Sequence, residues 1–179
     1  MRSRGFTLIE ILVVIVIIAV MLSLAVLSID VGGNDTPLDQ ESRRIVGLVN
    51  LLHDRALLEG HDFGLLIEPS AYRFLIYDDR LNAWQPYDAD RQFRPRRLPE
   101  GLSFRLELDG HLVVLKAPDS RFASDAAPPA PQIAIAASGE GTPFHLTLVR
   151  DSTGATRIIR GDALGRTKIV KAPAAASAS

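Results

Sequence analysis

The feature that most constrains this chain is a long apolar run at its N-terminus. The residues from Phe6 to Ile29 are apolar almost throughout, and about 24 residues in a helix extend about 36 Å at ~1.5 Å per residue. A bilayer core is ~30 Å thick and needs about 20 such residues. Because every backbone group in lipid must bond within the segment, the run predicts a single transmembrane helix.

The charges on either side of the apolar run indicate its orientation. Arg2 and Arg4 precede it, whereas Asp30 and Asp35 follow it and the next cation is Arg43. Since positive flanks stay on the cytoplasmic side, we expect a cytoplasmic N-terminus and a head on the opposite side of the membrane.

Glu10 is the residue that does not fit an ordinary membrane anchor. It lies inside the apolar run, between Ile9 and Ile11. An ionised carboxylate in hydrocarbon costs a few kcal/mol, so such residues are functional candidates. The alternative is a Glu10 that lies near the membrane surface and is simply tolerated.

The segment from Gly5 to Glu10, Gly-Phe-Thr-Leu-Ile-Glu, resembles the leader of type IV pilins and type II secretion pseudopilins. The resemblance implies that prepilin peptidase cuts after Gly5 and methylates the new N-terminal Phe6. It also implies that Glu10 guides subunit assembly. The alternative is a secretory signal peptide cleaved after Ala25, which would have no use for Glu10.

Composition limits the function classes. The 179 residues carry a net charge of −1 and include no cysteine, which excludes disulfides, thiol catalysis and cysteine-ligated zinc. A dedicated nucleic-acid binder usually shows a basic face, so nucleic acid is not an expected partner. The residues after the apolar run suffice for one domain with its own core.

A second helix is predicted from Pro37 to Glu59, with Thr36 as N-cap and Gly60 as the stop. An apolar stripe follows from the spacing of Leu38, Ile45, Val49, Leu52 and Ala56, and it is widened by Leu48, Leu51 and Leu58. The chain therefore divides into a leader (1–5), an anchor helix (6–29), a hinge (30–36), a head (37–171) and a disordered tail (172–179).

Alternating residues then predict a β-rich region. Strands are expected at 63–67, 72–77, 83–87, 102–108, 111–115, 132–136, 144–150, 156–160 and 167–170. Asp109-Gly110 is a strong signal for a two-residue hairpin turn, and the segment from Ala117 to Pro131 is expected to be a loop. The fold class is thus α+β, with a long N-terminal helix followed by a β-rich head.

Several head segments resemble the minor pseudopilin H family of type II secretion systems, within the type IV pilin-like proteins. These segments are 54–60, 84–86, 96–101, 138–144 and 161–165. The resemblance implies a head of two packed antiparallel sheets and a place near the pseudopilus tip. It also implies the major and other minor pseudopilins, prepilin peptidase and the inner-membrane secretion platform as partners, with the head in the periplasm.

The sequence shows no recognisable set of catalytic or cofactor-binding residues. His53, His61, His111 and His145 form no metal-ligand spacing. Ser138-Gly139-Glu140-Gly141 lacks the lysine of a phosphate loop, so it is interpreted as a strand connection. Paired aspartates at 78–79 and 88–90 lack calcium-loop spacing, and the basic cluster at 91–97 is interpreted as a solvated loop or protein-contact edge.

The sequence therefore predicts a structural subunit and not an enzyme, without cofactor or metal. Two alternatives remain open. One is a minor pilin of a type IV pilus, including one that binds DNA during uptake. The other is a membrane-tethered periplasmic enzyme.

Overall fold

The computed structural model describes residues 9–18, 35–88, 90–116 and 130–170. The chain divides into two units, Met1–Asn34 and Asp35–Ser179. In the first unit, residues 9–18 form a helix. Within the described ranges, no helix is both long and apolar enough to cross a membrane. The remainder of the predicted anchor, most of the loop at 117–131 and the tail at 172–179 lie outside the described residues.

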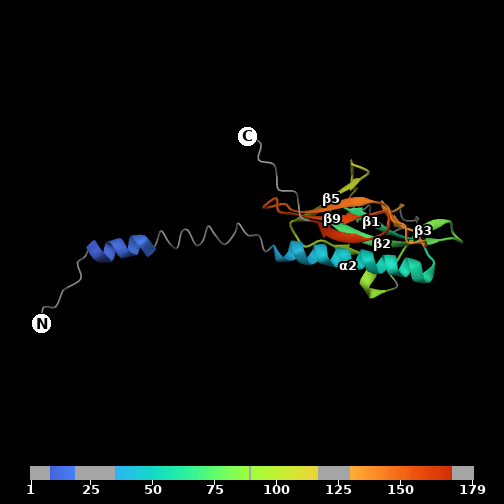
Figure 1. Ribbon diagram of the computed structural model, residues 1–179, viewed down its shortest axis with the longest axis horizontal. Coiled ribbons are helices and arrows are strands. Elements are labelled where there is room, and N and C mark those ends of the chain that lie inside the picture. Colours follow the sequence, from blue (N-terminus) through green and yellow to red (C-terminus); the bar gives the residue numbers. More distant parts are fainter. Residues whose placement is uncertain (1–8, 19–34, 89, 117–129, 171–179) are drawn as a thin grey trace. The chain divides into compact units, whose positions relative to one another are not determined.

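Helix α2 (Thr36–Glu59) opens the second unit and runs along one side of its strands (Figure 1). The predicted N-cap at Thr36 is wrong by one residue, because Asp35 caps the helix and accepts a hydrogen bond from Leu38 N–H. An aspartate carboxylate is the better acceptor for these unpaired amides. The predicted stop is confirmed, since Gly60 adopts a left-handed φ of 69°.

The apolar stripe of α2 is buried as predicted. Leu38, Ile45, Val49, Leu52 and Ala56 are each at most 1% exposed. Leu48 and Leu51 are partly buried against the same core. The inclusion of Leu58 is wrong, because this side chain is 85% exposed on the outward side of the helix.

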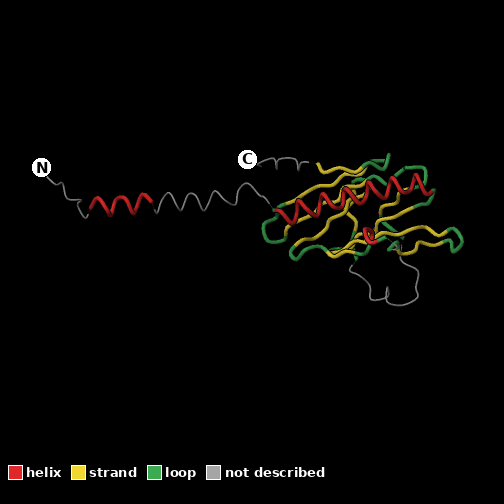
Figure 2. The backbone as a smooth tube through the Cα atoms, turned by 90° about the horizontal axis from the view of Figure 1, so that it is seen from below, coloured by secondary structure: helices red, strands yellow, loops and turns green. Residues whose placement is uncertain are grey.

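Two antiparallel five-stranded sheets form the rest of the head, and α2 lies lengthwise over their strands (Figure 2). The first sheet has the order β3-β2-β1-β7, with β4 pairing to β2. Its strands are β1 (Phe63–Glu68), β2 (Ala71–Asp78), β3 (Ala83–Pro86), β4 (Arg96–Arg97) and β7 (Ile133–Ile135). β1 is central and all six of its residues are buried.

The second sheet has the order β10-β9-β8-β5-β6. Its strands are β5 (Leu102–Leu108), β6 (His111–Val113), β8 (Phe144–Arg150), β9 (Thr156–Gly161) and β10 (Thr167–Val170). The predicted hairpin turn is confirmed, with positive φ at Asp109 (49°) and Gly110 (77°). β8 lies in the middle of this sheet, with a ladder on each side.

The core lies where the sheets and the helix meet. Buried residues of α2, of both sheets and of the short helix η1 (Arg91–Phe93) form one cluster. Phe74 contacts Phe93 at 5.1 Å between ring centres, and Tyr72 contacts Phe104 at 6.1 Å. The solvated-loop interpretation of 91–97 is wrong for Phe93, which is fully buried and ties this segment to the core.

Candidate assembly site

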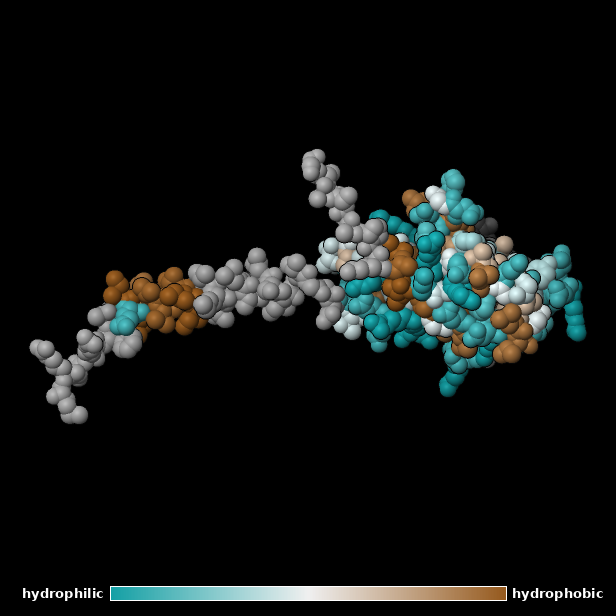
Figure 3. Space-filling view, in the orientation of Figure 1, coloured by the Kyte–Doolittle hydropathy of each residue, from teal (hydrophilic) through white to brown (hydrophobic). Residues whose placement is uncertain are grey.

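The leader residues Gly5 and Phe6 lie outside the described residues, whereas Glu10 lies in the helix at 9–18. Figure 3 shows this helix as an apolar surface interrupted by one hydrophilic side chain, and Glu10 is the one polar residue in the range. The aliphatic side chains of the helix at 9–18 are roughly half exposed, from 45% at Val14 to 70% at Ile9. So much apolar area is stable only in lipid or against other apolar helices.

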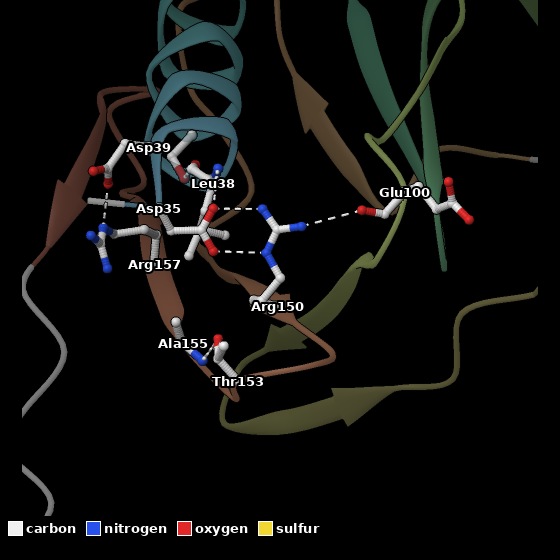
Figure 4. A network of polar contacts seen from close by, with 9 residues as sticks. Asp35, Leu38, Asp39, Glu100, Arg150, Thr153, Ala155 and Arg157 are labelled. Atoms are coloured by element: carbon white, nitrogen blue, oxygen red, sulfur yellow. Dashed lines mark hydrogen bonds and ion pairs between the residues drawn. The ribbon is translucent and has the colours of Figure 1, made fainter. Parts of the chain in front are cut away.

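The second candidate region is the start of the head, where α2 is held by two arginines of the second sheet (Figure 4). Arg150 binds the Asp35 carboxylate with two hydrogen bonds, from Nε at 2.7 Å and from Nη2 at 2.5 Å. Its third nitrogen donates to the Glu100 carbonyl at 3.2 Å. Both side chains of this pair are only 16% exposed, so the pair is largely withdrawn from water.

Asp35 thus performs two tasks with one carboxylate. It caps α2 through Leu38 N–H and it pairs with Arg150, which ends β8 115 positions away in sequence. The Arg150 hydrogen bonds hold the pKa of Asp35 below its usual value, against the opposing effect of desolvation. One helical turn further, Asp39 accepts a hydrogen bond of 2.5 Å from Arg157 of β9.

The substitutions Asp35→Asn and Asp35→Ala separate these two tasks. Asparagine is an equally good N-cap, so Asp35→Asn removes only the charge pair, whereas Asp35→Ala removes both contacts. In a fragment beginning at Asn34, we expect a loss of about 1–2 kcal/mol for asparagine and about 1 kcal/mol more for alanine. Urea unfolding at pH 7 measures both values.

The stability from this pair should also depend on pH. Because the pKa of Asp35 is lowered on folding, its contribution is complete above the unfolded value of about 3.9 and is lost as the pH falls through the folded pKa. Asp35→Asn should therefore destabilise the fragment at pH 7 and much less near pH 2. An equal effect at both pH values would contradict the assigned charge pair.

The distal half of α2 is fixed by side chains that reach backbone groups. The Asn50 amide accepts a hydrogen bond from the N–H of Thr167 at 3.0 Å and donates one to the carbonyl of the same residue at 3.1 Å. It thereby satisfies the backbone groups of one residue on the edge strand β10. His53 Nε2 lies 3.1 Å from the Gly139 carbonyl. A Cβ at Gly165 would fall 2.2 Å from the His53 ring, so this close approach needs a glycine.

The contact of His53 with Gly139 explains one predicted feature of the sequence. The Ser138–Gly141 segment is the connection between β7 and β8, as predicted, and it packs on His53. On the other flank of α2, Arg55 bonds Tyr87 and Asp90 and lies 5.2 Å from the centre of the Phe93 ring. Arg55 therefore connects Tyr87, Asp90 and Phe93 to the helix.

A cleft of about 260 Å³ lies on the second sheet. Glu107, His145 and Arg160 lie side by side on neighbouring strands within it. The lining includes no serine, threonine or cysteine to act as a nucleophile. Among the described residues, no three histidine or acidic side chains are grouped to hold a metal ion.

Comparison with known proteins gives the family. Residues 1–26 match the prokaryotic N-terminal methylation motif, and residues 41–165 match the type II transport protein GspH. The chain is 41% identical to type II secretion system protein H of Pseudomonas aeruginosa over 82% of this chain and 83% of that protein. It is 30% identical to the Vibrio cholerae protein of the same name, over 82% of each chain.

Solved structures agree in fold. The crystal structure of the minor pseudopilin EpsH from Vibrio cholerae superposes with a TM-score of 0.63 at 24% identity, over 80% of this chain and 99% of that chain. The solution structure of Escherichia coli GspH gives a TM-score of 0.56 at 24% identity, over 78% and 94%. With a motif, a family match over most of the head and a relative at 41% identity in agreement, the chain belongs to the type II transport protein GspH family.

Proposed function

We propose that this chain is a minor pseudopilin of a type II secretion system. In this role it is a structural subunit near the tip of the periplasmic pseudopilus and helps to export folded proteins across the outer membrane. One observation carries the proposal: a methylation motif at 1–26 and a GspH match at 41–165 occur in this order in one chain. The GspH match favours secretion over the type IV pilus and over a tethered enzyme.

The proposal gives each N-terminal segment a task. The basic leader stays cytoplasmic, the anchor spans the bacterial inner membrane once, and the head lies in the periplasm. Prepilin peptidase cuts between Gly5 and Phe6 and methylates Phe6. The major pseudopilin, the other minor pseudopilins and the inner-membrane platform are the partners, and an external motor supplies the energy of assembly.

Glu10 is the proposed assembly contact. Cleavage creates an α-ammonium at Phe6, and such groups have an ordinary pKa of about 7.7–8.0, so they are largely charged near neutrality. A neighbouring subunit displaced along the fibre presents its ammonium to Glu10. In lipid this pairing offsets the desolvation of both charges and fixes the axial register.

The cleavage site is tested by the mass of the mature chain. Protein purified from the membranes of its own host should begin at N-methyl-Phe6. Gly5→Leu should leave the precursor uncleaved in the membrane, because the bulky side chain blocks the peptidase, whereas Ser3→Ala serves as a control and should be processed normally. A mature chain that begins at Val26 would overturn the pseudopilin proposal in favour of a signal peptide.

The secretion role is tested in a deletion strain. Removal of the gene should leave the secreted proteins in the periplasm, and the full chain supplied in trans should restore their export. Unchanged export in the deletion strain, together with loss of surface pili, would favour the pilus alternative.

A further inference from the structure

Strand β6, at the edge of the second sheet, leaves one side of its backbone free. It pairs with β5, and among the described residues no other strand meets its far side. Two of the other sheet edges are closed. On β10, Asn50 bonds both backbone groups of Thr167, and beside β7 the Thr142 N–H donates to the Ala134 carbonyl at 2.9 Å. Since an open edge is a template for pairing with another chain, β6 is a candidate binding edge.

The geometry of the hairpin shows which backbone groups face the free side of β6. The two-residue turn Asp109-Gly110 brings Leu108 opposite His111, and the pair that flanks such a turn exchanges both hydrogen bonds. Because the pattern alternates, the next residue, Leu112, directs its N–H and its carbonyl away from β5. Val114 follows in the same alternation. These two residues therefore offer unpaired donors and acceptors at the edge.

The same two residues carry exposed apolar side chains. Leu112 is 74% exposed and Val114 is 86% exposed, whereas Val113 and Leu115 between and after them pack partly against the core. Charges, prolines and bulges commonly protect an edge strand, yet the range 111–115 contains no proline and no acidic, lysine or arginine residue. Free backbone groups beside exposed apolar side chains favour the addition of a strand.

The edge of β6 is complementary to itself. In an antiparallel pair of copies with Val113 opposite Val113, Leu112 of each copy lies opposite Val114 of the other, and both use their free backbone groups. The same register brings the exposed Lys116 beside the turn of the other copy, next to its exposed Asp109. A shift by two residues in one direction places Lys116 opposite Leu112, and a shift in the other direction places Val114 against the turn.

We propose that two copies of this chain pair antiparallel through β6, about a two-fold axis at Val113, and so join their second sheets into one. The contact is isologous, because the same residues serve on both sides. The pairing goes beyond the proposed function and does not depend on it. Under that function, neighbours in the fibre are displaced along its axis, a relation that a two-fold pair does not have. The pair is then an unassembled form of the chain in the membrane.

The test is disulfide crosslinking of the full chain in the membranes of its own host. The chain contains no cysteine, so one introduced cysteine reports one position. Directly opposite residues that exchange no hydrogen bonds have Cα atoms ~4.5 Å apart, within the range of about 4.4–6.8 Å for a disulfide. Under a mild oxidant, Val113→Cys should therefore give a product with the mass of two chains. Leu164→Cys, at a residue 61% exposed between β9 and β10, is the matched control and should give at least about tenfold less.

A second reporter uses exposed positions, where a cysteine does not disturb the core. Leu112→Cys and Val114→Cys chains are produced together in one host. Because Leu112 lies opposite Val114 of the other copy, the mixed disulfide should form in preference to either disulfide between like chains. Equal amounts of the three products would contradict the register.

Substitutions at the edge test its backbone groups and its charges in the Val113→Cys chain. Val114→Pro removes an N–H that points away from β5, so it spares the ladder within the head and should lower the product about tenfold. Val114→Thr keeps the N–H and the branched shape and should retain most of the product. Lys116→Glu places a like charge beside Asp109 of the other copy, which should lower the product about threefold at low salt and less at high salt.

Export and assembly separate the pairing from the proposed function. If Glu10→Gln blocks incorporation, it should raise the Val113→Cys product, because more chain stays unassembled, and Val114→Pro alone should restore export in the deletion strain. No product from either reporter, equal product from Leu164→Cys, or a product insensitive to Val114→Pro would overturn the pairing. Lost export with Val114→Pro would overturn the unassembled form. Export restored by the wild-type chain would leave the proposed function standing in each case.

Discussion

Glu10→Gln should leave the chain inserted, cleaved and folded, yet unable to join the pseudopilus. The glutamine keeps the size of the side chain but removes the anion that meets the α-ammonium of the neighbouring subunit. Breaking one side of a desolvated ion pair costs about 3–5 kcal/mol, which corresponds to a loss of at least about 100-fold in the assembly contact. Secretion should therefore fail, and crosslinks from this chain to other pseudopilins should disappear.

The control for this substitution is Glu10→Asp, which keeps the charge on a shorter side chain and should retain part of the secretion. Ile15→Leu, in the same described helix, should have no effect. The alternative is an ion pair within one chain, between Glu10 and its own N-terminus. In that case Glu10→Gln would still be incorporated and secretion would be normal, and Glu10 would be a tolerated membrane carboxylate.

The second large effect is expected at Phe74 of β2. Its ring is 1% exposed and packs edge-on against Tyr72 and Phe93. Phe74→Ala removes this ring from the aromatic cluster and leaves a cavity, at a cost of about 3–5 kcal/mol. Because domains of this kind have a total stability of about 5–15 kcal/mol, the loss should be evident in urea unfolding of the fragment that begins at Asn34.

Leu112→Ala is the matched control for Phe74→Ala, since Leu112 is 74% exposed and its truncation should change stability by less than about 0.5 kcal/mol. A loss below about 1 kcal/mol for Phe74→Ala would contradict the tight aromatic packing. An intermediate in the unfolding curve would mean that the two sheets do not unfold as one cooperative unit.

Periodic features of the sequence predicted the fold well. The five residues of the α2 stripe repeat with the helix period and face one core, so their burial followed from spacing alone. The Asp109-Gly110 turn is determined by local backbone preference, and it formed as predicted. The prediction that Leu58 is buried was wrong, because this residue lies outside the angular range of the stripe and hydrophobicity alone does not bury a side chain.

Contacts between residues far apart in the chain could not be predicted from the sequence. Nothing near Asp35 indicates Arg150, because the partner lies 115 positions away and is brought near only by the pairing of β8 with its neighbours. Glu41 is a similar case: the residue is 3% exposed, and its carboxylate accepts hydrogen bonds from Tyr72 and Arg44. Phe93 alone carried a usable signal, as the one aromatic residue within a run of arginines.

Under the proposed function, the pair of Asp35 and Arg150 has a consequence for how the head bears mechanical load. A subunit that is lifted or pushed through its anchor receives that force at Asp35, the first residue of the head unit. The bidentate guanidinium passes part of the load to the end of β8, the strand held by ladders on both sides. We therefore expect tension to be shared between the helix and the centre of a sheet, so that α2 does not separate from the head turn by turn.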